Sequence, residues 1–421
     1  MEILIRNSHT LDVAVIGGGP AGTAAAIEAA RAGLRAGIWE RDCFPRDKVC
    51  GEFVSFEALP FIDREIPLAA ARGAAIHYAE FVSSSGLGRR FPLPHPARGL
   101  SRFLLDTELW SAAKAAGVEA HEGESVSRVR KAVANRRQEN AWEFEVAGGG
   151  TRIAKTLIIA CGRWWRIDGL ASPALRGGPD APGEWVGAKA RFAGIETRGA
   201  VEMYFFGGGY CGLAPVEDNA CNLCCMVRRR LVRECRVKSH EFSAWLEQVT
   251  CHPALVSRLR GATQISPVVT TAPVQPARHS ATQNGALMVG DASGFLDPFT
   301  GDGISLALHS GRLAAKTAAR FLSGEFEEER AARVYERKLS QAVRQCYRIA
   351  ALARGLLQGP TWMQCAATAA LPWLGKQLVR QTRWRTPLED LEPLLVNRRI
   401  ALDHDILPRD FFDFPDKQSV P

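Results

Sequence analysis

The chain has 421 residues, which is long enough for two or three domains that share a large buried core. Hydrophobic residues at 46% and charged residues at 23% are the balance of a soluble globular protein. The formal net charge of +8 suits an anionic ligand. The basic residues are spread along the chain and no nucleic-acid-binding module accompanies them, so we expect no nucleic-acid partner.

The first predicted unit is a buried strand, a glycine turn and an alanine-rich helix. The apolar run 12–16 stops at Gly17, and a helix over 23–31 begins just after Gly22. With this spacing Gly17 makes the tight turn, Gly19 lets a pyrophosphate approach the backbone, and Gly22 lets the helix pack on the strand. The helix N-terminus then directs free N–H groups and the positive end of its dipole at the phosphates.

A second predicted strand ends on an acidic residue. The apolar run 36–39 is followed by Glu40, near the offset of ~20 residues at which an acid binds the adenosine ribose. Strand, turn, helix and acid together predict a dinucleotide site. Its predicted residues are Gly17, Gly19, Pro20, Ala21, Gly22, Glu40 and Arg41.

The dinucleotide is indicated by a second unit of the same kind far along the chain. The buried strand 286–289 runs into a turn at Gly290 and Asp291, and a glycine-rich stretch over 294–304 leads into a helix over 305–321. A nicotinamide enzyme does not need this second device, whereas the long FAD molecule does. Asp291 suits the ribityl hydroxyls, and the helix dipole would favour an anionic reduced flavin. The predicted residues here are Gly290, Asp291, Pro298, Gly301, Gly303 and Ile304.

Two motifs carry a resemblance to a known family. They are residues 44–52, Phe-Pro-Arg-Asp-Lys-Val-Cys-Gly-Glu, and the run 290–304. With the first glycine turn they resemble the flavoprotein superfamily of p-hydroxybenzoate hydroxylase, most closely its geranylgeranyl reductase branch, over most of residues 10–325. The resemblance implies that Arg102 lies along the cofactor near its pyrophosphate. It also implies that Cys50 lies beside the flavin ring, as a proton donor or as a small packing residue.

The resemblance implies an α/β fold with a Rossmann-like FAD-binding domain, an inserted antiparallel β-sheet for the substrate and a C-terminal helical region. We expect the FAD-binding domain to be discontinuous, over 1–65, 98–165 and 270–325. The expected substrate domain covers 66–97 and 166–269, and the helical region covers 326–421.

The residues imply an enzyme with an apolar substrate. Residues 204–215 are aromatic and glycine-rich, and the resemblance places them opposite the flavin, with Tyr210 as a second candidate for a catalytic acid. We expect C=C reduction, or the reverse desaturation, in an isoprenoid, lipid or polyketide-like molecule. An FAD-dependent monooxygenase or hydroxylase is the alternative, and a flavin-binding redox sensor is the non-enzyme alternative. Halogenases of this scaffold carry Trp-x-Trp-x-Ile-Pro, which is absent, so halogenation is disfavoured.

One position departs from the hydroxylases. They usually carry an Asp-Gly pair that is tied to FAD and NAD(P)H use, where this chain has Cys161-Gly162. A neutral thiol in place of a carboxylate puts direct reduction by NADPH in doubt. NADPH and an electron-donor protein therefore both stay open as the source of electrons.

The eleven cysteines are scattered, and residues 1–12 lack the apolar core of a signal peptide, so we expect a cytoplasmic protein with reduced thiols. Cys221, Cys224 and Cys225 resemble half of a zinc site, but no second half follows, and we predict no metal. Within 349–385, the apolar segments 349–357 and 362–374, which basic residues follow, are each too short to span a membrane. They predict either helices packed on the protein's own body or an interfacial helix that makes peripheral membrane contact.

Overall fold

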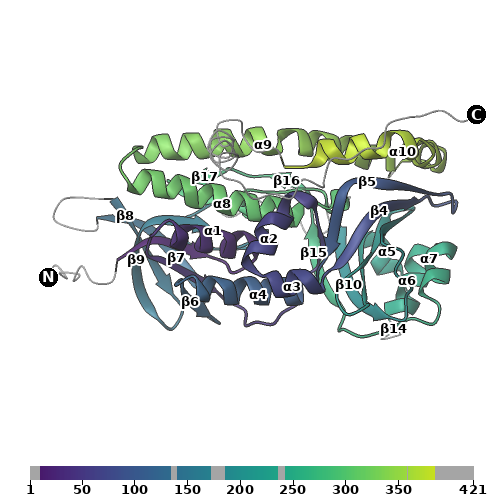
Figure 1. The fold of residues 1–421 in the computed structure, drawn as a ribbon, viewed down its shortest axis with the longest axis horizontal. Coiled ribbons are helices and arrows are strands. Elements are labelled where there is room, and N and C mark those ends of the chain that lie inside the picture. Colours follow the sequence, from purple (N-terminus) through teal and green to yellow (C-terminus); the bar gives the residue numbers. More distant parts are fainter. Residues whose placement is uncertain (1–9, 134–139, 172–184, 236–241, 358, 385–421) are drawn as a thin grey trace, which may run out of the picture. The chain divides into compact units, whose positions relative to one another are not determined.

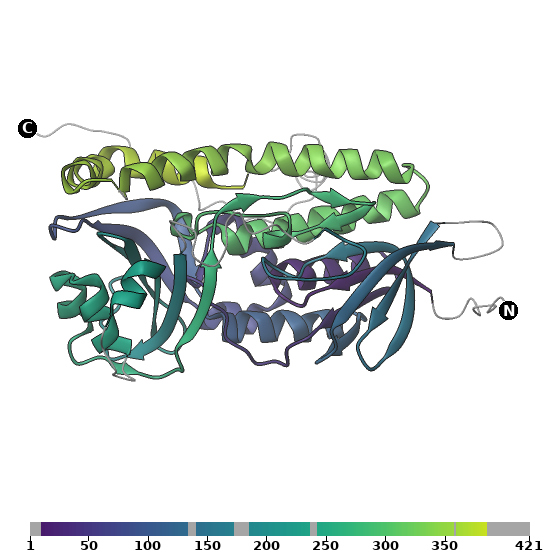
Figure 2. The same cartoon turned by 180° about the vertical axis from the view of Figure 1, so that it is seen from behind.

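The computed structural model describes residues 10–133, 140–171, 185–235, 242–357 and 359–384. The described chain contains two main β-sheets and a set of helices that pack on them (Figures 1 and 2). Residues up to Trp384 form one contact unit, so the predicted domain boundaries stay a prediction.

The first sheet is built around the opening strand β1 (Leu11–Ile16). This strand lies parallel to β2 (Ala36–Glu40) on one side and to β9 (Gly150–Ile159) on the other. Strands buried on both faces are expected to be continuously apolar, which explains why these runs do not alternate. The strand order is β17-β18-β9-β1-β2-β6, with the hairpin strands β7 and β8 beside β9. The remaining bounds are β6 (Glu119–Glu122), β7 (Val126–Val133), β8 (Asn140–Val146), β17 (Thr282–Gln283) and β18 (Ala286–Met288).

Helices α1 (Pro20–Arg31), α4 (Arg102–Ala115) and α8 (Gly303–Leu322) belong to this first layer. Helix α4 begins at a serine cap, because the Ser101 side chain accepts a hydrogen bond from the Leu104 N–H at 3.1 Å. Helix α1 packs on both α4 and α8. The contact between α1 and α8 is so close that a Cβ on Gly311 would lie 2.1 Å from the Ala21 carbonyl oxygen.

The second sheet has the order β14-β10-β13-β12-β11-β4-β5-β3, with β15 also paired to β10. Its pairs are antiparallel except for β4 with β11, which are parallel. The strands are β3 (Phe53–Val54), β4 (Ala74–Val82), β5 (Gly88–Gly99), β10 (Trp185–Ala193), β11 (Ala200–Phe206), β12 (Gly209–Pro215), β13 (Cys221–Arg228), β14 (Thr263–Gln264) and β15 (Val269–Val274). The expected α/β fold with an inserted, mainly antiparallel sheet is thus confirmed. The predicted division at 269/270 falls inside β15.

The two faces of the second sheet pack against different partners. Tyr204 and Phe206 belong to a core with helices α6 (Phe242–Thr250) and α7 (Pro253–Leu259). Met203 and Phe205 alternate with them and belong to a separate cluster, together with Tyr210. The period-two alternation of the strand therefore sends one set of side chains to the helices and the other to the opposite face.

Short elements connect these layers, and two long helices follow them. The short elements are η2 (Phe56–Ala58), α2 (Leu59–Glu65), α3 (Pro67–Arg72), α5 (Arg229–Glu234), β16 (Ala277–Arg278), η3 (Gly290–Ala292), β19 (Gly294–Phe295) and η4 (Pro298–Thr300). Helix α9 (Glu328–Leu357) packs on α8, and α10 (Thr361–Thr382) packs on α9 and β5. The predicted helical region is confirmed for these residues, and 385–421 lie outside the described chain. None of the described helices combines the length and hydropathy that a membrane span requires.

Gly22 is the residue on which the first strand–helix contact depends. A Cβ at this position would lie 1.8 Å from the Gly17 carbonyl oxygen, and backbone cannot move aside as a flexible side chain can. We expect Gly22→Ala to lower the free energy of unfolding by about 3 kcal/mol. Thermal or urea unfolding followed by circular dichroism measures this.

Gly355→Ala is the matched control, since a Cβ at Gly355 on α9 would meet nothing within 4 Å. In a helix this change is neutral or stabilises by about 1 kcal/mol. Equal unfolding curves for the two variants would contradict the close contact at Gly22.

Candidate functional site

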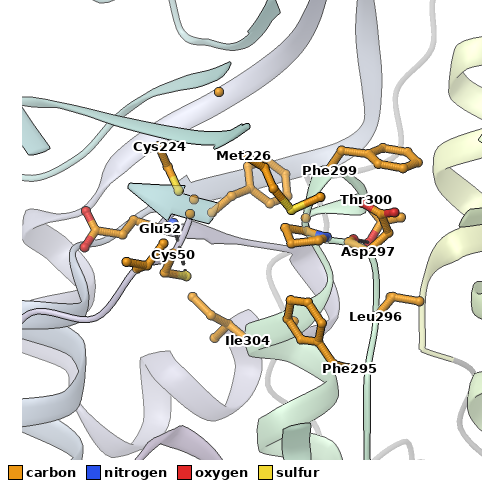
Figure 3. A pocket seen from close by; sticks show the side chains of 18 of the residues that line it. Cys50, Glu52, Cys224, Met226, Phe295, Leu296, Asp297, Phe299, Thr300 and Ile304 are labelled. Carbon is orange, nitrogen blue, oxygen red and sulfur yellow. Dashed lines mark hydrogen bonds between the residues drawn. The ribbon is translucent and has the colours of Figure 1, made fainter. Parts of the chain in front are cut away.

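A cavity of about 280 Å³ runs between the two main sheets of the described chain. Its lining begins at Gly19 in the first glycine turn, passes Asp291 and Gly303, and ends on the inner face of the second sheet at Met203 and Tyr210. Figure 3 shows part of this lining, with Cys50 between Cys224 and Ile304 in that view. The cavity therefore joins the two turns that the sequence singled out.

The first turn has the predicted local geometry. Gly17 has φ +109°, a conformation that glycine adopts without strain, and this confirms its place in the tight turn. The confirmed role of Gly22 is to let α1 approach the strand. Gly19, Pro20 and Ala21 all line the cavity, and a Cβ at Gly19 would meet only the Arg102 Nη2 atom, at 3.8 Å. The turn thus leaves open space at the one glycine that was predicted to face a phosphate.

Glu40 is buried at the end of β2, but it does not line the described cavity. Its Oε2 accepts a hydrogen bond from the Gly18 N–H at 2.7 Å, and Arg46 Nη1 lies 2.6 Å from its Oε1. Arg41 is exposed and lies beside Asp42, 3.7 Å away. The ribose-binding roles of Glu40 and Arg41 stay predictions.

Arg102 lies at the start of α4 and lines the cavity beside Gly19. Its guanidinium donates two hydrogen bonds to Asp106, at 2.6 and 2.7 Å. Burial alone would lower the pKa of Arg102, but the Asp106 carboxylate more than offsets it and the pKa is raised. The cation is therefore permanent and held in one orientation by a bidentate pair.

The second turn also lies on the cavity. Gly290 has φ +56°, and its N–H donates to the Ser310 hydroxyl at 2.9 Å, which ties the turn to α8. Asp291 follows in η3 and lines the cavity. Burial raises the pKa of Asp291, although Arg163, 3.7 Å away, acts in the opposite direction.

The stretch from Pro298 to Ile304 forms the rim where α8 begins. Pro298, Gly301, Gly303 and Ile304 all line the cavity, as predicted from the run 290–304. Gly301 has φ +71°, and a Cβ there would lie 2.9 Å from the Phe53 ring. Gly301 therefore lets the turn pack against Phe53, and Gly303, whose Cβ would meet nothing within 4 Å, leaves bare backbone open to the cavity.

Cys50 lies on the loop after β2 and lines the cavity. Its backbone carbonyl accepts a hydrogen bond from Asn222 Nδ2 at 2.9 Å, which fixes the loop to β13. Its thiol accepts one from the Glu52 N–H at 3.4 Å. Burial raises the pKa of the Cys50 thiol, so the sulfur keeps its proton at neutral pH.

Tyr210 projects from β12 into the apolar end of the cavity. Its hydroxyl lies 3.8 Å from the Met226 sulfur, and its ring meets the edge of Phe299 with 6.2 Å between centroids. Burial raises the pKa of Tyr210 far above its ordinary value. The structure thus brings both proposed proton donors, Cys50 and Tyr210, to one cavity.

Sequence reasoning missed a buried charge cluster beneath the Cys50 loop. Lys189 is fully buried on β10, where its ammonium contacts Glu52 and lies 2.9 Å from Asp47. Burial by itself lowers the pKa of Lys189, but the two carboxylates raise it. The one available signal was a lysine in the apolar alternating run 186–192.

Two arginines that line the cavity were also missed. Arg163 lies beside Asp291, with its guanidinium over the Phe295 ring at 4.3 Å, and its Nη1 is buried without a hydrogen-bond partner. Arg383 follows α10 and pairs with Asp302 just before α8. No local pattern marked either residue.

The residues present fit a long, anionic, partly flat ligand. Gly51, Gly162 and Gly303 all line the cavity, and a Cβ on any of them would meet nothing within 4 Å. Bare backbone therefore faces open space along the cavity, and Arg102 and Arg163 add positive charge to it. Among the described residues, no group of His, Cys, Asp and Glu side chains could hold a metal ion.

Comparisons with known proteins agree with this geometry. A family model described as FAD dependent oxidoreductase matches residues 12–45, the first strand, turn and helix. A tryptophan 2-halogenase of Chondromyces crocatus is 25% identical over 88% of this chain and 71% of its own length. A digeranylgeranylglycerophospholipid reductase of Methanopyrus kandleri is 27% identical over 73% of this chain and 76% of its own.

Among solved structures, the flavin-dependent brominase Bmp2 superposes with a TM-score of 0.72 at 20% identity, over 93% of this chain and 100% of the brominase. At this identity the likeness shows a shared fold. The family match over residues 12–45 and these relatives make the chain similar to FAD-dependent oxidoreductases over most of its length.

Proposed function

We propose that this flavoenzyme moves a hydride to or from a carbon–carbon bond of a hydrophobic molecule. The observation that carries the proposal is the apolar end of the cavity. The second sheet contributes these lining residues: Ala79, Phe81, Phe91, Leu93, Val201, Met203, Tyr210, Ala214 and Met226. A polar substrate would lose its water there without gaining hydrogen bonds, whereas an isoprenoid, lipid or polyketide-like chain gains from the burial.

The charged lining residues belong to other elements. Arg102 and Arg163 lie near the two glycine turns, where they would hold the cofactor's diphosphate, and Asp291 would accept hydrogen bonds from its ribityl chain. The backbone N–H of Gly303, at the start of α8, would hold the edge of its ring. Bound FAD supplies hydride-transfer chemistry at such a site.

The proton is assigned to Cys50. Its thiol is protonated at neutral pH because burial raises the pKa, and the Asn222 bond keeps the loop in place. A reduction of a C=C bond needs a proton at the carbon opposite the hydride, and a positioned thiol can donate it. Tyr210 is the second proton donor in the same cavity, and we assign it the role if Cys50 proves to be a packing residue.

Halogenation is the second candidate, because the tryptophan 2-halogenase matches more of this chain than the lipid reductase does. Against it, no two tryptophans of this chain are separated by one residue, as the halogenase signature requires. The other O₂-dependent alternative is hydroxylation.

Product analysis decides among these reactions. Anaerobic photoreduction of the enzyme in the presence of candidate lipids should yield a saturated product. A product that forms only with O₂, with or without halide, would overturn the proposal.

The cavity is open at Gly19. A Cβ there meets only Arg102 at 3.8 Å, so Gly19→Val should fold normally yet prevent a diphosphate from reaching the backbone. We expect a colourless protein with near wild-type unfolding, against a yellow wild type with about one FAD per chain. Flavin absorbance after purification measures the difference. A fully loaded Gly19→Val, or a wild type that cannot be reconstituted with FAD, would contradict the site.

Another prediction concerns the Cys50 thiol. Cys50→Ala should keep FAD and substrate affinity but lose ~10²–10⁴-fold in rate, because it removes a positioned acid. Single-turnover kinetics from pre-reduced enzyme measures the rate per bound flavin. Cys224→Ala is the control, since that thiol also lines the cavity but is assigned no proton. If both variants keep the wild-type rate, Cys50 is a scaffold residue.

A separate prediction concerns the electron donor. Cys161 donates a hydrogen bond from its thiol to the Ile16 carbonyl at 3.2 Å, and burial raises its pKa to about 12, so no carboxylate-like charge is available there. We expect NADPH alone to reduce the flavin slowly in stopped-flow bleaching, and an electron-donor protein to be required. Fast, saturable bleaching by NADPH would show the opposite, and Cys161→Asp tests the position directly.

A further inference from the structure

The outermost helix, α10, has an inner face and an outer face of different character. Inside, Leu371 is buried against Phe91, and a Cβ on Gly375 would lie 2.6 Å from that ring. Val379 and Arg383 reach the cavity itself. Figures 1 and 2 show α10 at the edge of the described chain, beyond β5. The helix is therefore one wall of the apolar cavity.

The outer face of α10 exposes large apolar side chains. Trp362 is 72% exposed and Trp373 is 79% exposed, with Leu374 and Leu378 beside them. Trp373 follows Trp362 by eleven positions and Arg380 follows Trp373 by seven, offsets that return to the same side of an α-helix. Apolar patches of this kind on one surface mark an interaction site.

The charged residues of α10 and of the stretch that leads into it have one sign. From Arg337 to Trp384 the sequence contains no Asp or Glu, and the exposed residues of α10 include Lys376 and Arg380. Exposed tryptophans beside cations are the composition of segments that lie at the headgroup level of a bilayer. A second copy of this chain would bring the same cations together without carboxylates from this helix to pair with them.

We propose that the outer face of α10, formed by Trp362, Trp373, Leu374, Leu378, Lys376 and Arg380, docks this protein onto an anionic lipid bilayer. The proposal deepens the proposed function, because a bilayer is where a hydrophobic substrate dissolves. Docking through α10 would place this wall of the cavity next to the bilayer in which the substrate is dissolved. The docking is peripheral, since the opposite side of the helix, at Leu371 and Gly375, is packed against Phe91 of β5.

Vesicle co-sedimentation with the full-length, FAD-loaded protein tests the docking without any catalytic readout. We expect binding to vesicles that contain phosphatidylglycerol and much weaker binding to pure phosphatidylcholine. Trp362→Ser/Trp373→Ser should weaken binding by about tenfold or more, because two indoles no longer bury their rings. Lys376→Gln/Arg380→Gln should weaken it by about 25-fold, at about fivefold for each cation near the surface.

Leu68→Ser is the matched control, since Leu68 on α3 is 83% exposed and lies outside this face. It should bind as the wild type does. Wild-type binding by the double tryptophan variant, or equal binding to both vesicle types, would overturn the proposal. So would a dimer, seen by light scattering, that the tryptophan variant dissociates. Unchanged flavin content shows that all variants are folded. Vesicle binding is read without turnover, so its failure is distinguished from a failure of the proposed function, which product analysis tests.

Discussion

The close approach of α1 and α8 is the constraint on which the rest of the structure depends. Gly311 and Gly22 remove the side chains that would hold α1 away from α8 and from the glycine turn. Gly290 has φ +56°, and a Cβ at this position would lie 2.9 Å from the Ala21 Cβ. Because Gly311 and Gly22 each let backbone approach backbone, the N-termini of α1 and α8 are brought to one cavity. Two turns that are far apart in sequence thereby become one site.

The second sheet is attached to this core through buried charge. Glu52 has φ +57°, which is strained for a residue with a Cβ, and its carboxylate accepts a hydrogen bond from the Arg102 N–H at 2.8 Å. The same carboxylate contacts Lys189 on β10. Burying such ions is costly unless each has partners, and here Asp47 and Arg191 complete the cluster, 3.0 Å apart. The Cys50 loop is thus held at a fixed position between two sheets, which suits a loop that must place one thiol.

The sequence predicted those features that depend on neighbours along the chain. Gly17 and Gly22 belong to a strand–turn–helix pattern whose backbone requirements are local, and the run 290–304 is of the same kind. Part of the apolar wall was predicted from the aromatic, glycine-rich stretch 204–215, which contributes Tyr210, Gly212 and Ala214 to the cavity. Pairs that span the fold gave no such signal: Lys189 meets Glu52 across 137 positions, and Arg383 meets Asp302 across 81. Arg163 is of the same kind, since it faces Asp291 across 128 positions of the sequence.

The pairing of Arg383 with Asp302 has a thermodynamic consequence. Asp302 immediately precedes α8, burial raises its pKa to about 6, and the guanidinium that compensates it belongs to the end of α10. The stability of the cavity rim at Asp302 therefore depends on where α10 places Arg383. A molecule bound inside the cavity and a surface that holds α10 from outside act on the same helix. Thermodynamic linkage is reciprocal. If binding at the outer face of α10 changes the affinity of the cavity for its ligand by some factor, the ligand changes the affinity of that face by the same factor.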